Sequence, residues 1–144
     1  MTPGAPPPQF SGRCACGAVR YECSAAPVSM VNCHCRACQR AGGAGHSPTV
    51  VVSRAAFRVS RGEPKVFESA ADSGGTARRA FCADCGSPLF ASSSARPDLV
   101  GIRAGSLDDP SWFRPTADVW ADCAQPWDAL DPSTAKLPRD RSRQ

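Results

Sequence analysis

The sequence has no hydrophobic run long enough to cross a membrane, for which about 20 consecutive apolar residues are needed. Its first ten residues, MTPGAPPPQF, also lack the basic start and the apolar stretch of a secretory signal. These absences predict a cytoplasmic protein with no membrane partner. The chain has 144 residues, of which 42% are hydrophobic, and this is enough for one domain with a core but hardly for two.

A surplus of basic residues is also missing from most of the chain. The formal net charge is +4, but four basic residues and one acidic residue lie in 136–144, so residues 1–135 carry 13 basic and 12 acidic groups. If seven cysteines held two Zn²⁺ as thiolates, the charge of residues 1–135 would fall to about −2. The charge pattern therefore predicts no nucleic-acid partner.

Cysteine, in contrast, is abundant. The chain has nine cysteines, and most of them lie in short pairs with the spacing CxC or CxxC. Disulfides are rare in a reducing cytoplasm, so this spacing favours metal binding over cross-links. The odd number of cysteines points weakly in the same direction.

Between the cysteines the chain has the pattern of a mainly β protein. In AVRYEC, residues 18–23, apolar and charged residues alternate as in a half-buried strand. Similar short runs, separated by glycine, proline, serine or aspartate, are SPTVVVS, AAFRVS, KVFES, TARRAFC, PLFAS, DLVGIRAG and ADVWAD. One short helix is predicted after Cys35, in RACQRA, and it should end at Gly42 and Gly43.

The two ends of the chain have a different composition. Residues 1–9 are rich in proline, and residues 132–144 are polar and basic with little to bury. Both are expected to be flexible tails. The remaining segment, 10–131, is then the single zinc-binding domain.

The first set of candidate metal ligands comprises Cys14 and Cys16 in GRCACG, and Cys82 and Cys85 in FCADCG. A glycine follows each pair and permits the tight turn of a metal-binding knuckle. Four thiolates would make a closed, structural zinc site that joins two distant parts of the chain. Spacing alone leaves another division open, in which Cys82 and Cys85 pair with Cys33 and Cys35.

The second set is in NCHCRACQRAGG, where Cys33, Cys35 and Cys38 offer three thiolates to a second zinc. This site would keep a fourth position for water, substrate or another residue. His34 could be the fourth ligand, but both of its neighbours are ligands, which makes chelation by all three awkward. We rather expect His34 to contact a ligand or to be exposed.

The other candidate residues have simpler interpretations. Cys23 and Cys123 are expected to pack in the core, and His46 is expected to be a loop residue rather than a catalytic base. Arg78 and Arg79 alternate on one strand, so at most one of them points inward.

At this stage the sequence resembles a known family. GRCACGAVRYEC, NCHCRACQRAGGAG, AAFRVSRGEP, RAFCADCGSPLF, GSLDDP and PW have the order and approximate spacing seen in the glutathione-dependent formaldehyde-activating enzymes, which include centromere protein V. The resemblance extends over roughly residues 10 to 130. It implies a tent-like, mainly β fold of short antiparallel strands built around zinc-binding cysteine knuckles.

The resemblance also implies roles for the cysteines. Cys14, Cys16, Cys82 and Cys85 match the family's structural zinc ligands, and Cys33, Cys35 and Cys38 match its catalytic zinc ligands. The implied activity is that of a carbon-sulfur lyase, whose reverse reaction condenses formaldehyde with glutathione to S-hydroxymethylglutathione. Two positions depart from the family, since Asp118 stands where histidine is frequent and Ser87 where threonine is usual.

Two classes of function remain from the sequence. One is an enzyme that acts on a thiol such as glutathione, with Arg79 and His34 as candidate substrate-binding residues and Arg79 matching an arginine that the family often has before FC. The other is a binding module in which both zinc ions are structural. A fourth protein ligand on the second zinc would favour the module, and an accessible water or thiol there would favour the enzyme.

Overall fold

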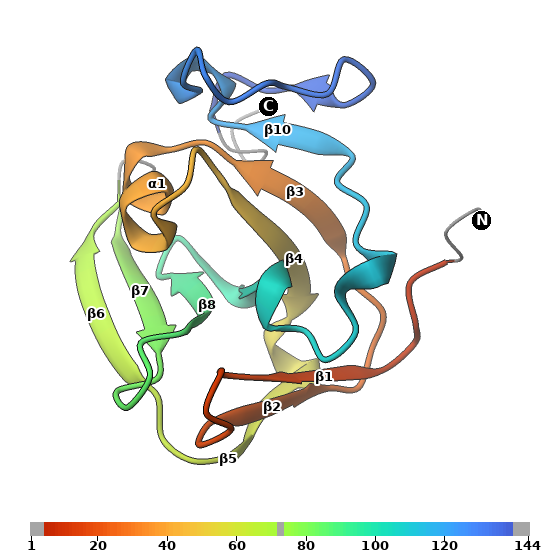
Figure 1. Cartoon of the computed structure of the whole chain (residues 1–144), viewed down its shortest axis with the longest axis vertical. Coiled ribbons are helices and arrows are strands. Elements are labelled where there is room, and N and C mark those ends of the chain that lie inside the picture. Colours follow the sequence, from red (N-terminus) through yellow and green to blue (C-terminus); the bar gives the residue numbers. More distant parts are fainter. Residues whose placement is uncertain (1–4, 72–73, 140–144) are drawn as a thin grey trace.

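The fold is built mainly from strands, as the sequence predicts. The computed structural model describes residues 5–71 and 74–139 and is 43% strand and 14% helix. Figure 1 shows the strands in two groups, with β1, β2 and β5 below a large curved sheet. In the described residues no helix is both long and apolar enough to span a bilayer.

The smaller sheet has the strand order β1-β2-β5 and is antiparallel. Its members are β1 (Phe10–Arg13), β2 (Arg20–Cys23) and β5 (Phe57–Arg61). Tyr21 of β2 is fully buried, and its hydroxyl forms a hydrogen bond of 2.6 Å with Ser106 Oγ. The alternation predicted for residues 18–23 is therefore present, with Tyr21 and Cys23 inward and Glu22 outward.

The larger sheet has eight strands in the order β11-β10-β3-β4-β9-β8-β7-β6. Its pairings are antiparallel except those of β10, which runs parallel to both β3 and β11. In chain order its members are β3 (Ser29–Cys33), β4 (Ser47–Ser53), β6 (Lys65–Ala70), β7 (Thr76–Phe81), β8 (Pro88–Ser93), β9 (Arg96–Arg103), β10 (Ala117–Val119) and β11 (Ala135–Lys136).

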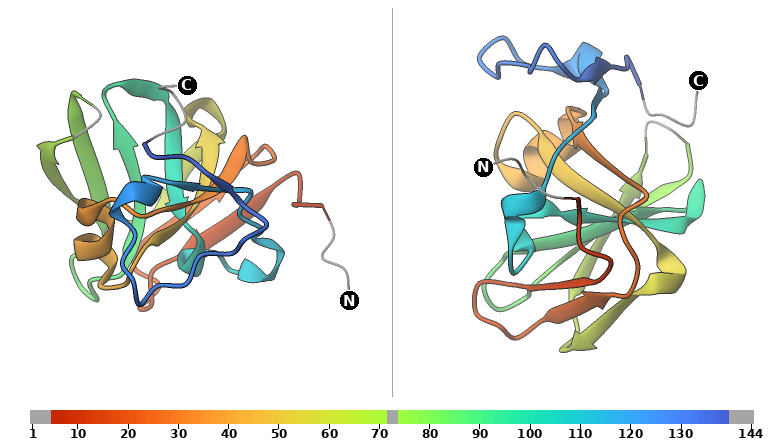
Figure 2. Two further views of the ribbon diagram at one scale, coloured as in Figure 1. Left: turned by 90° about the horizontal axis from the view of Figure 1, so that it is seen from above. Right: turned by 90° about the vertical axis from the view of Figure 1, so that its right-hand side faces the viewer.

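The main core lies between the two sheets. Inward residues of β4, β8 and β9 meet the buried face of β2, and the larger of these side chains are Tyr21, Val50, Val52, Leu89, Val100 and Ile102. A second, smaller cluster lies on the other side of β3, where Val31, Ala117, Val119 and Trp120 pack together. Figure 2 shows the C-terminal segment that covers this side, drawn in blue at the end of the molecule farthest from β1 and β2.

Short helices fill the connections. The predicted helix is confirmed as α1 (Arg36–Gly42), which ends at Gly43 in the left-handed conformation, with φ 74°. Residues 5–71 and 74–139 also contain four single 3-10 turns, namely η1 (Arg54–Ala56), η2 (Ala104–Ser106), η3 (Pro110–Trp112) and η4 (Ala121–Cys123). Three strands were not anticipated by the sequence pattern, namely β1, β3 and β11.

The expected flexible tails extend partly outside the described residues, which exclude 1–4 and 140–144. In the described part of the C-terminal tail, however, Ala135–Lys136 forms a strand beside β10. Thr134 is buried, and Leu137 packs on the smaller cluster. Residues 134–137 are thus packed against the fold, because their backbone and Thr134 find partners on β10, which the polar composition did not reveal.

Candidate metal centres

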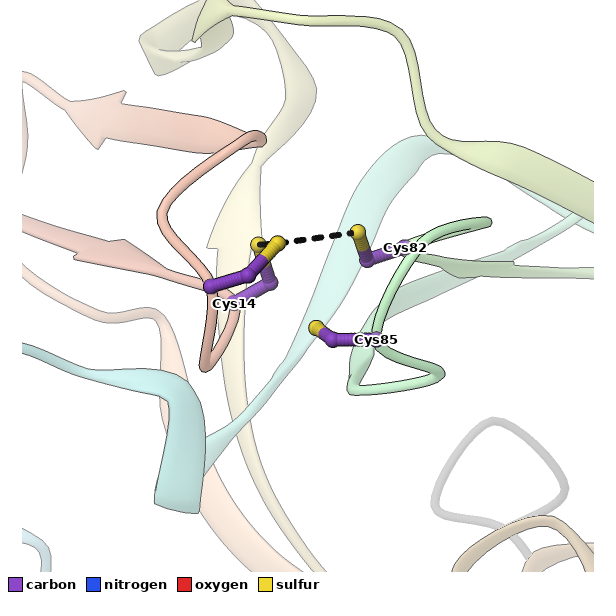
Figure 3. A group of neighbouring side chains, drawn as sticks. Cys14, Cys82 and Cys85 are labelled. Carbon is purple, nitrogen blue, oxygen red and sulfur yellow. Dashed lines mark hydrogen bonds between the residues drawn. The ribbon is translucent and has the colours of Figure 1, made fainter.

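The first group of cysteines comes together from two distant turns. Cys14 and Cys16 lie between β1 and β2, and Cys82 and Cys85 lie between β7 and β8. One sulfur from each residue lies within 4.8 Å of the other three. Figure 3 shows Cys82 and Cys85 on one loop pointing toward Cys14 on the facing hairpin. The sequence predicted this set of four.

The local backbone explains why the sulfurs converge. Gly17 and Gly86 have φ values of 80° and 79°, which L side chains rarely adopt, as expected for the turn after each pair. Each glycine N–H donates to the carbonyl of the first cysteine of its pair, at 3.2 Å for Gly17 and 2.8 Å for Gly86. Ser87 connects the turns, since its Oγ accepts from the Ala15 N–H at 3.0 Å. Serine at position 87 therefore keeps the hydroxyl that the family's usual threonine would provide.

The thiols of this group differ sharply in acidity. The Ser87 hydroxyl holds the pKa of Cys85 down to about 5. The pKa of Cys16 is lowered by a hydrogen bond from the Ala18 N–H. The neighbouring Cys14 thiol more than offsets this effect and raises the pKa of Cys16 to about 12. Thiols this close cannot all ionise without a compensating cation. The group therefore has the donors and the charge requirement of a Cys₄ metal site.

The second group lies where β3 ends and α1 begins. Cys33 is the last residue of β3, Cys35 is the N-cap of α1, and Cys38 lies in its first turn. The Cys35 sulfur accepts from the Cys38 N–H at 3.3 Å, which folds the segment back on itself. The three sulfurs lie within 4.8 Å of one another. The two groups are separate, so Cys82 and Cys85 do not pair with Cys33 and Cys35.

The acidity of the second group follows the same principle. Hydrogen bonds from Cys33 and Cys35 hold the pKa of Cys38 down to about 2, against the effect of burial. The same contacts, with burial, raise the pKa of Cys33 far above its ordinary value. Arg103 and Arg79 contribute to the acidity of Cys38, so positive charge lies near these sulfurs. One thiolate forms readily here, and three would need a cation.

The three thiols line a cavity of about 300 Å³. Apolar side chains from β3, β4, β8 and β9 form much of its wall, together with Trp120, and three arginines supply its positive charge: Arg79, Arg96 and Arg103. A larger cavity of about 550 Å³ reaches His46 and Cys14 but none of these three thiols. The smaller cavity is therefore the one that brings the three-cysteine group together with cationic side chains.

The arginines of β7 point in opposite directions, as their alternation predicted. Arg78 is exposed and forms an ion pair with Glu68 on β6. Arg79 lines the cavity, and its Nε is buried with no hydrogen-bond partner among the described residues. Buried polar groups are normally paired, but the contact of this guanidinium to Ser69 Oγ, made by Nη1, is long at 3.5 Å. Arg103 is held instead, since it donates to Ser47 Oγ at 2.6 Å and to Thr49 Oγ1 at 3.1 Å.

His34 lies on the other side of the Cys33–Cys35 segment. It is 1% exposed, its Nε2 lies 2.7 Å from Asp118 Oδ1, and it is not among the residues that line the thiol cavity. Burial raises the pKa of Asp118, but hydrogen bonds from Thr134, His34 and Lys136 more than offset this and hold it below its usual range. Asp118, at the position where the family often has a histidine, is thus a carboxylate that fixes the orientation of His34.

Some residues near these groups were not identified from the sequence. Arg96 and Arg103 lie in the cavity because β9 passes beside β4 and β8, which no local motif indicates. His46 directly precedes β4, as a loop residue, but its Nδ1 lies 2.7 Å from Asp128 Oδ2, 82 residues away. Asp128 has no motif of its own, so only the fold reveals this contact.

Comparisons with known proteins agree with this architecture. The family of glutathione-dependent formaldehyde-activating enzymes matches residues 9–123. A crystal structure of a Rhodobacter sphaeroides protein has a similar fold, with a TM-score of 0.57 and 23% sequence identity, over 69% of this chain and 88% of that one. No curated protein matches the chain. Since the family match spans both cysteine groups and most of the chain, the protein belongs to the glutathione-dependent formaldehyde-activating enzyme family.

Proposed function

We propose that the protein is a zinc-dependent carbon-sulfur lyase or synthase that acts on a thiol such as glutathione, in the manner of an S-hydroxymethylglutathione synthase. The observation that carries the proposal is the cavity in which three thiols meet three arginines. The family match supports the same chemistry. In this view the four-cysteine group is structural, because four thiolates complete a tetrahedral zinc site, and the three-cysteine group keeps a position for the substrate.

Zinc fits the donors that the chain offers. Both groups consist of thiols only, which are preferred ligands of zinc, and each group contains thiols that cannot all ionise alone. Cys14, Cys16, Cys82 and Cys85 would hold one ion, and Cys33, Cys35 and Cys38 the other. When bound at the second group, zinc would lower the pKa of a substrate thiol and so supply a nucleophilic sulfur at neutral pH.

The arginines can orient a substrate of this kind. Glutathione carries two carboxylates and one thiol, and guanidinium groups bind carboxylates in bidentate geometry. Arg79 is suited to this role because its buried Nε lacks a partner in the described residues. Arg103 is already fixed by Ser47 and Thr49, so it presents its charge without loss of side-chain entropy. The apolar side chains around Trp120 would limit the number of water molecules beside the reacting groups.

The proposed reaction is balanced without an oxidant or a reductant. In the synthetic direction the thiol loses its proton, its sulfur attacks the carbon of formaldehyde, and a carbon-sulfur bond forms. The carbonyl electron pair moves to oxygen, which takes up a proton. The lyase direction reverses each step, and the chain contributes binding, orientation and a positive environment for the anionic species.

The test is the rate at which formaldehyde and glutathione equilibrate with their adduct. The condensation also runs unaided, so an enzyme-free sample is the control. We expect the zinc-loaded protein to exceed this control and Cys35→Ser to fall to it. Cys123→Ser is a matched variant, because Cys123 belongs to neither cysteine group, and it should keep the parent rate. A parent protein that never exceeds the control with any thiol would reject the enzyme and favour a zinc-stabilised binding module.

A further inference from the structure

The end of β3 presents chemical groups on both of its faces. The His34 N–H donates to the Val119 carbonyl at 3.0 Å, so the backbone stays extended beyond Cys33. Neighbouring side chains of an extended chain point in opposite directions. Cys33 and Cys35 accordingly line the thiol cavity, while the ring of His34 faces Asp118 and Asp128. This second face is not used by the proposed reaction.

The ring of His34 is held in the manner of a metal ligand. Its Nε2 lies 2.7 Å from Asp118 Oδ1 and must donate, because a carboxylate only accepts. The neutral ring then has its lone pair on Nδ1. That atom is buried and finds no hydrogen-bond partner among the described residues, and Asp128 Oδ2 lies 3.6 Å from it. Metal-binding histidines usually donate their other nitrogen to a carboxylate in this way.

Two further potential metal ligands, His46 and Asp128, lie near the Nδ1 of His34. His46 Nδ1 lies 2.7 Å from Asp128 Oδ2, and the rings of His34 and His46 have centroids 5.0 Å apart. One donor atom from each of the three residues lies within 4.8 Å of the others. To bind a cation through Nδ1, the neutral ring of His46 must carry its hydrogen on Nε2. This is possible because His46 is 29% exposed, so that water can accept from the Nε2–H.

Gly45 makes room for this arrangement. A Cβ at Gly45 would lie 2.5 Å from Asp128 Oδ2 and 2.7 Å from its Cβ, closer than such atoms approach in proteins. The backbone of Gly45 is not in the left-handed region, so its conformation does not require glycine. Glycine is needed here because a side chain would collide with Asp128. The carboxylate of Asp128 therefore reaches the two histidines across a glycine.

We propose that His34, His46 and Asp128 form a separate cation site, which takes a divalent transition metal such as Zn²⁺ or Co²⁺ through two nitrogens and one carboxylate oxygen. Imidazole nitrogens with a carboxylate suit this class of ion better than Mg²⁺ or Ca²⁺, which prefer oxygen ligands. Three protein ligands leave positions for water. The site lies across the Cys33–Cys35 segment from the three thiols and does not depend on the proposed reaction.

The bound ion would connect two parts of the fold. Asp128 belongs to the segment after η4, whereas His34 and His46 flank α1. η4 and this segment already contact α1, because Gln39 Nε2 donates to the carbonyl of Cys123, the last residue of η4, at 3.0 Å, and Gln125 Nε2 donates to Gln39 Oε1 at 3.1 Å. A cation at the three residues would hold the same two parts together and should raise the melting temperature.

The test uses the purified protein with zinc in its thiol groups, to which Co²⁺ is added. Co²⁺ bound by nitrogen and oxygen gives weak visible bands, whereas Co²⁺ bound by thiolate also gives intense sulfur-to-metal bands in the near ultraviolet. We expect one Co²⁺ per chain with the first kind of spectrum and a higher melting temperature. His46→Ala and Asp128→Asn should each weaken Co²⁺ binding about tenfold or more.

Two further variants make the test specific. Gly45→Ala should also weaken Co²⁺ binding, because its Cβ displaces the Asp128 carboxylate without removing a ligand. Asp122→Asn is the matched control, since Asp122 is an exposed carboxylate of the adjacent η4 and the substitution should leave binding unchanged. Equal binding by the parent, His46→Ala and Asp128→Asn would overturn the proposal. So would a parent that takes up no Co²⁺, or one that shows sulfur-to-metal bands only.

Discussion

At the scale of single residues, the contrast between Arg78 and Arg79 is the most informative. They are neighbours on β7, yet Arg78 is exposed beside Glu68, while Arg79 has a buried nitrogen that no described residue satisfies. A buried charged donor without a partner is costly in a folded protein. An anionic group in the cavity, such as a substrate carboxylate, would accept a hydrogen bond from this nitrogen and offset the cost.

The pair provides a direct test of substrate recognition. Arg79→Gln should lower kcat/KM for glutathione by about 10- to 100-fold, since a hydrogen bond to a charged group contributes about 1.5–3 kcal/mol. Arg78→Gln removes the same charge from the exposed face and should have little effect. Steady-state rates with each variant decide between these outcomes. Equal losses in both variants would show that Arg79 acts only through the overall charge.

A second residue-scale prediction separates metal binding from helix capping. Cys35 is both a member of the three-cysteine group and the N-cap of α1. Cys35→Ser keeps an oxygen that can accept at the N-cap, and serine is among the best residues there. The variant should therefore melt near the parent and yet lose the second zinc and the activity. Metal analysis and thermal melting test this, and a variant that unfolds would assign a structural role to the second group.

At the scale of elements, the two cysteine turns join strands that are far apart in the chain. The first turn connects β1 and β2 of the small sheet, and the second connects β7 and β8 of the large sheet. The two sheets therefore contact each other through these turns as well as through the core, and Cys14 and Cys82 are both buried. The loss of a ligand here should therefore affect the whole fold.

Cys82→Ser is the corresponding stability prediction. A structural zinc site contributes on the order of 10 kcal/mol, which is comparable to the net stability of a typical domain. We expect the variant to lose zinc and to be largely unfolded at room temperature. Circular dichroism and zinc content measure this, with Cys123→Ser as the control that retains both. If Cys82→Ser melted like the parent, the structural role of the four-cysteine group would be wrong.

The sequence predicted some elements well and others not at all. β4, β6 and α1 follow from alternation, from short apolar runs and from Gly43, all of which are local signals. β3 and β11 have no such pattern, and they form because β3 pairs with β4 and β10 and because β11 pairs with β10. The cysteine pairs were predictable because each is local, whereas spacing alone left open which pairs come together in the fold. Arg103 and Asp128 were not, since their neighbours are set by long-range strand order.

At the scale of the whole molecule, the C-terminal segment completes the edge of the large sheet. Its strand β11 pairs with β10, and Leu137 covers the smaller apolar cluster around Val31 and Trp120. Thr134 donates to the buried carboxylate of Asp118, and Lys136 lies 3.2 Å from it. Asp118 in turn orients His34. The segment therefore supports a buried charge as well as an apolar surface.

Removal of this segment should consequently destabilise the protein. A chain that ends at Asp131 would leave the Asp118 carboxylate buried beside His34 without Thr134 or Lys136, and loss of such partners costs about 1–3 kcal/mol or more. It would also expose part of the cluster around Trp120. We expect a lower midpoint of urea unfolding at unchanged zinc content. A chain that ends at Arg139 keeps every contact described for the segment and should unfold like the parent. If both truncated chains matched the parent, residues 132–139 would be a tail that contributes nothing to stability, as their composition alone suggests.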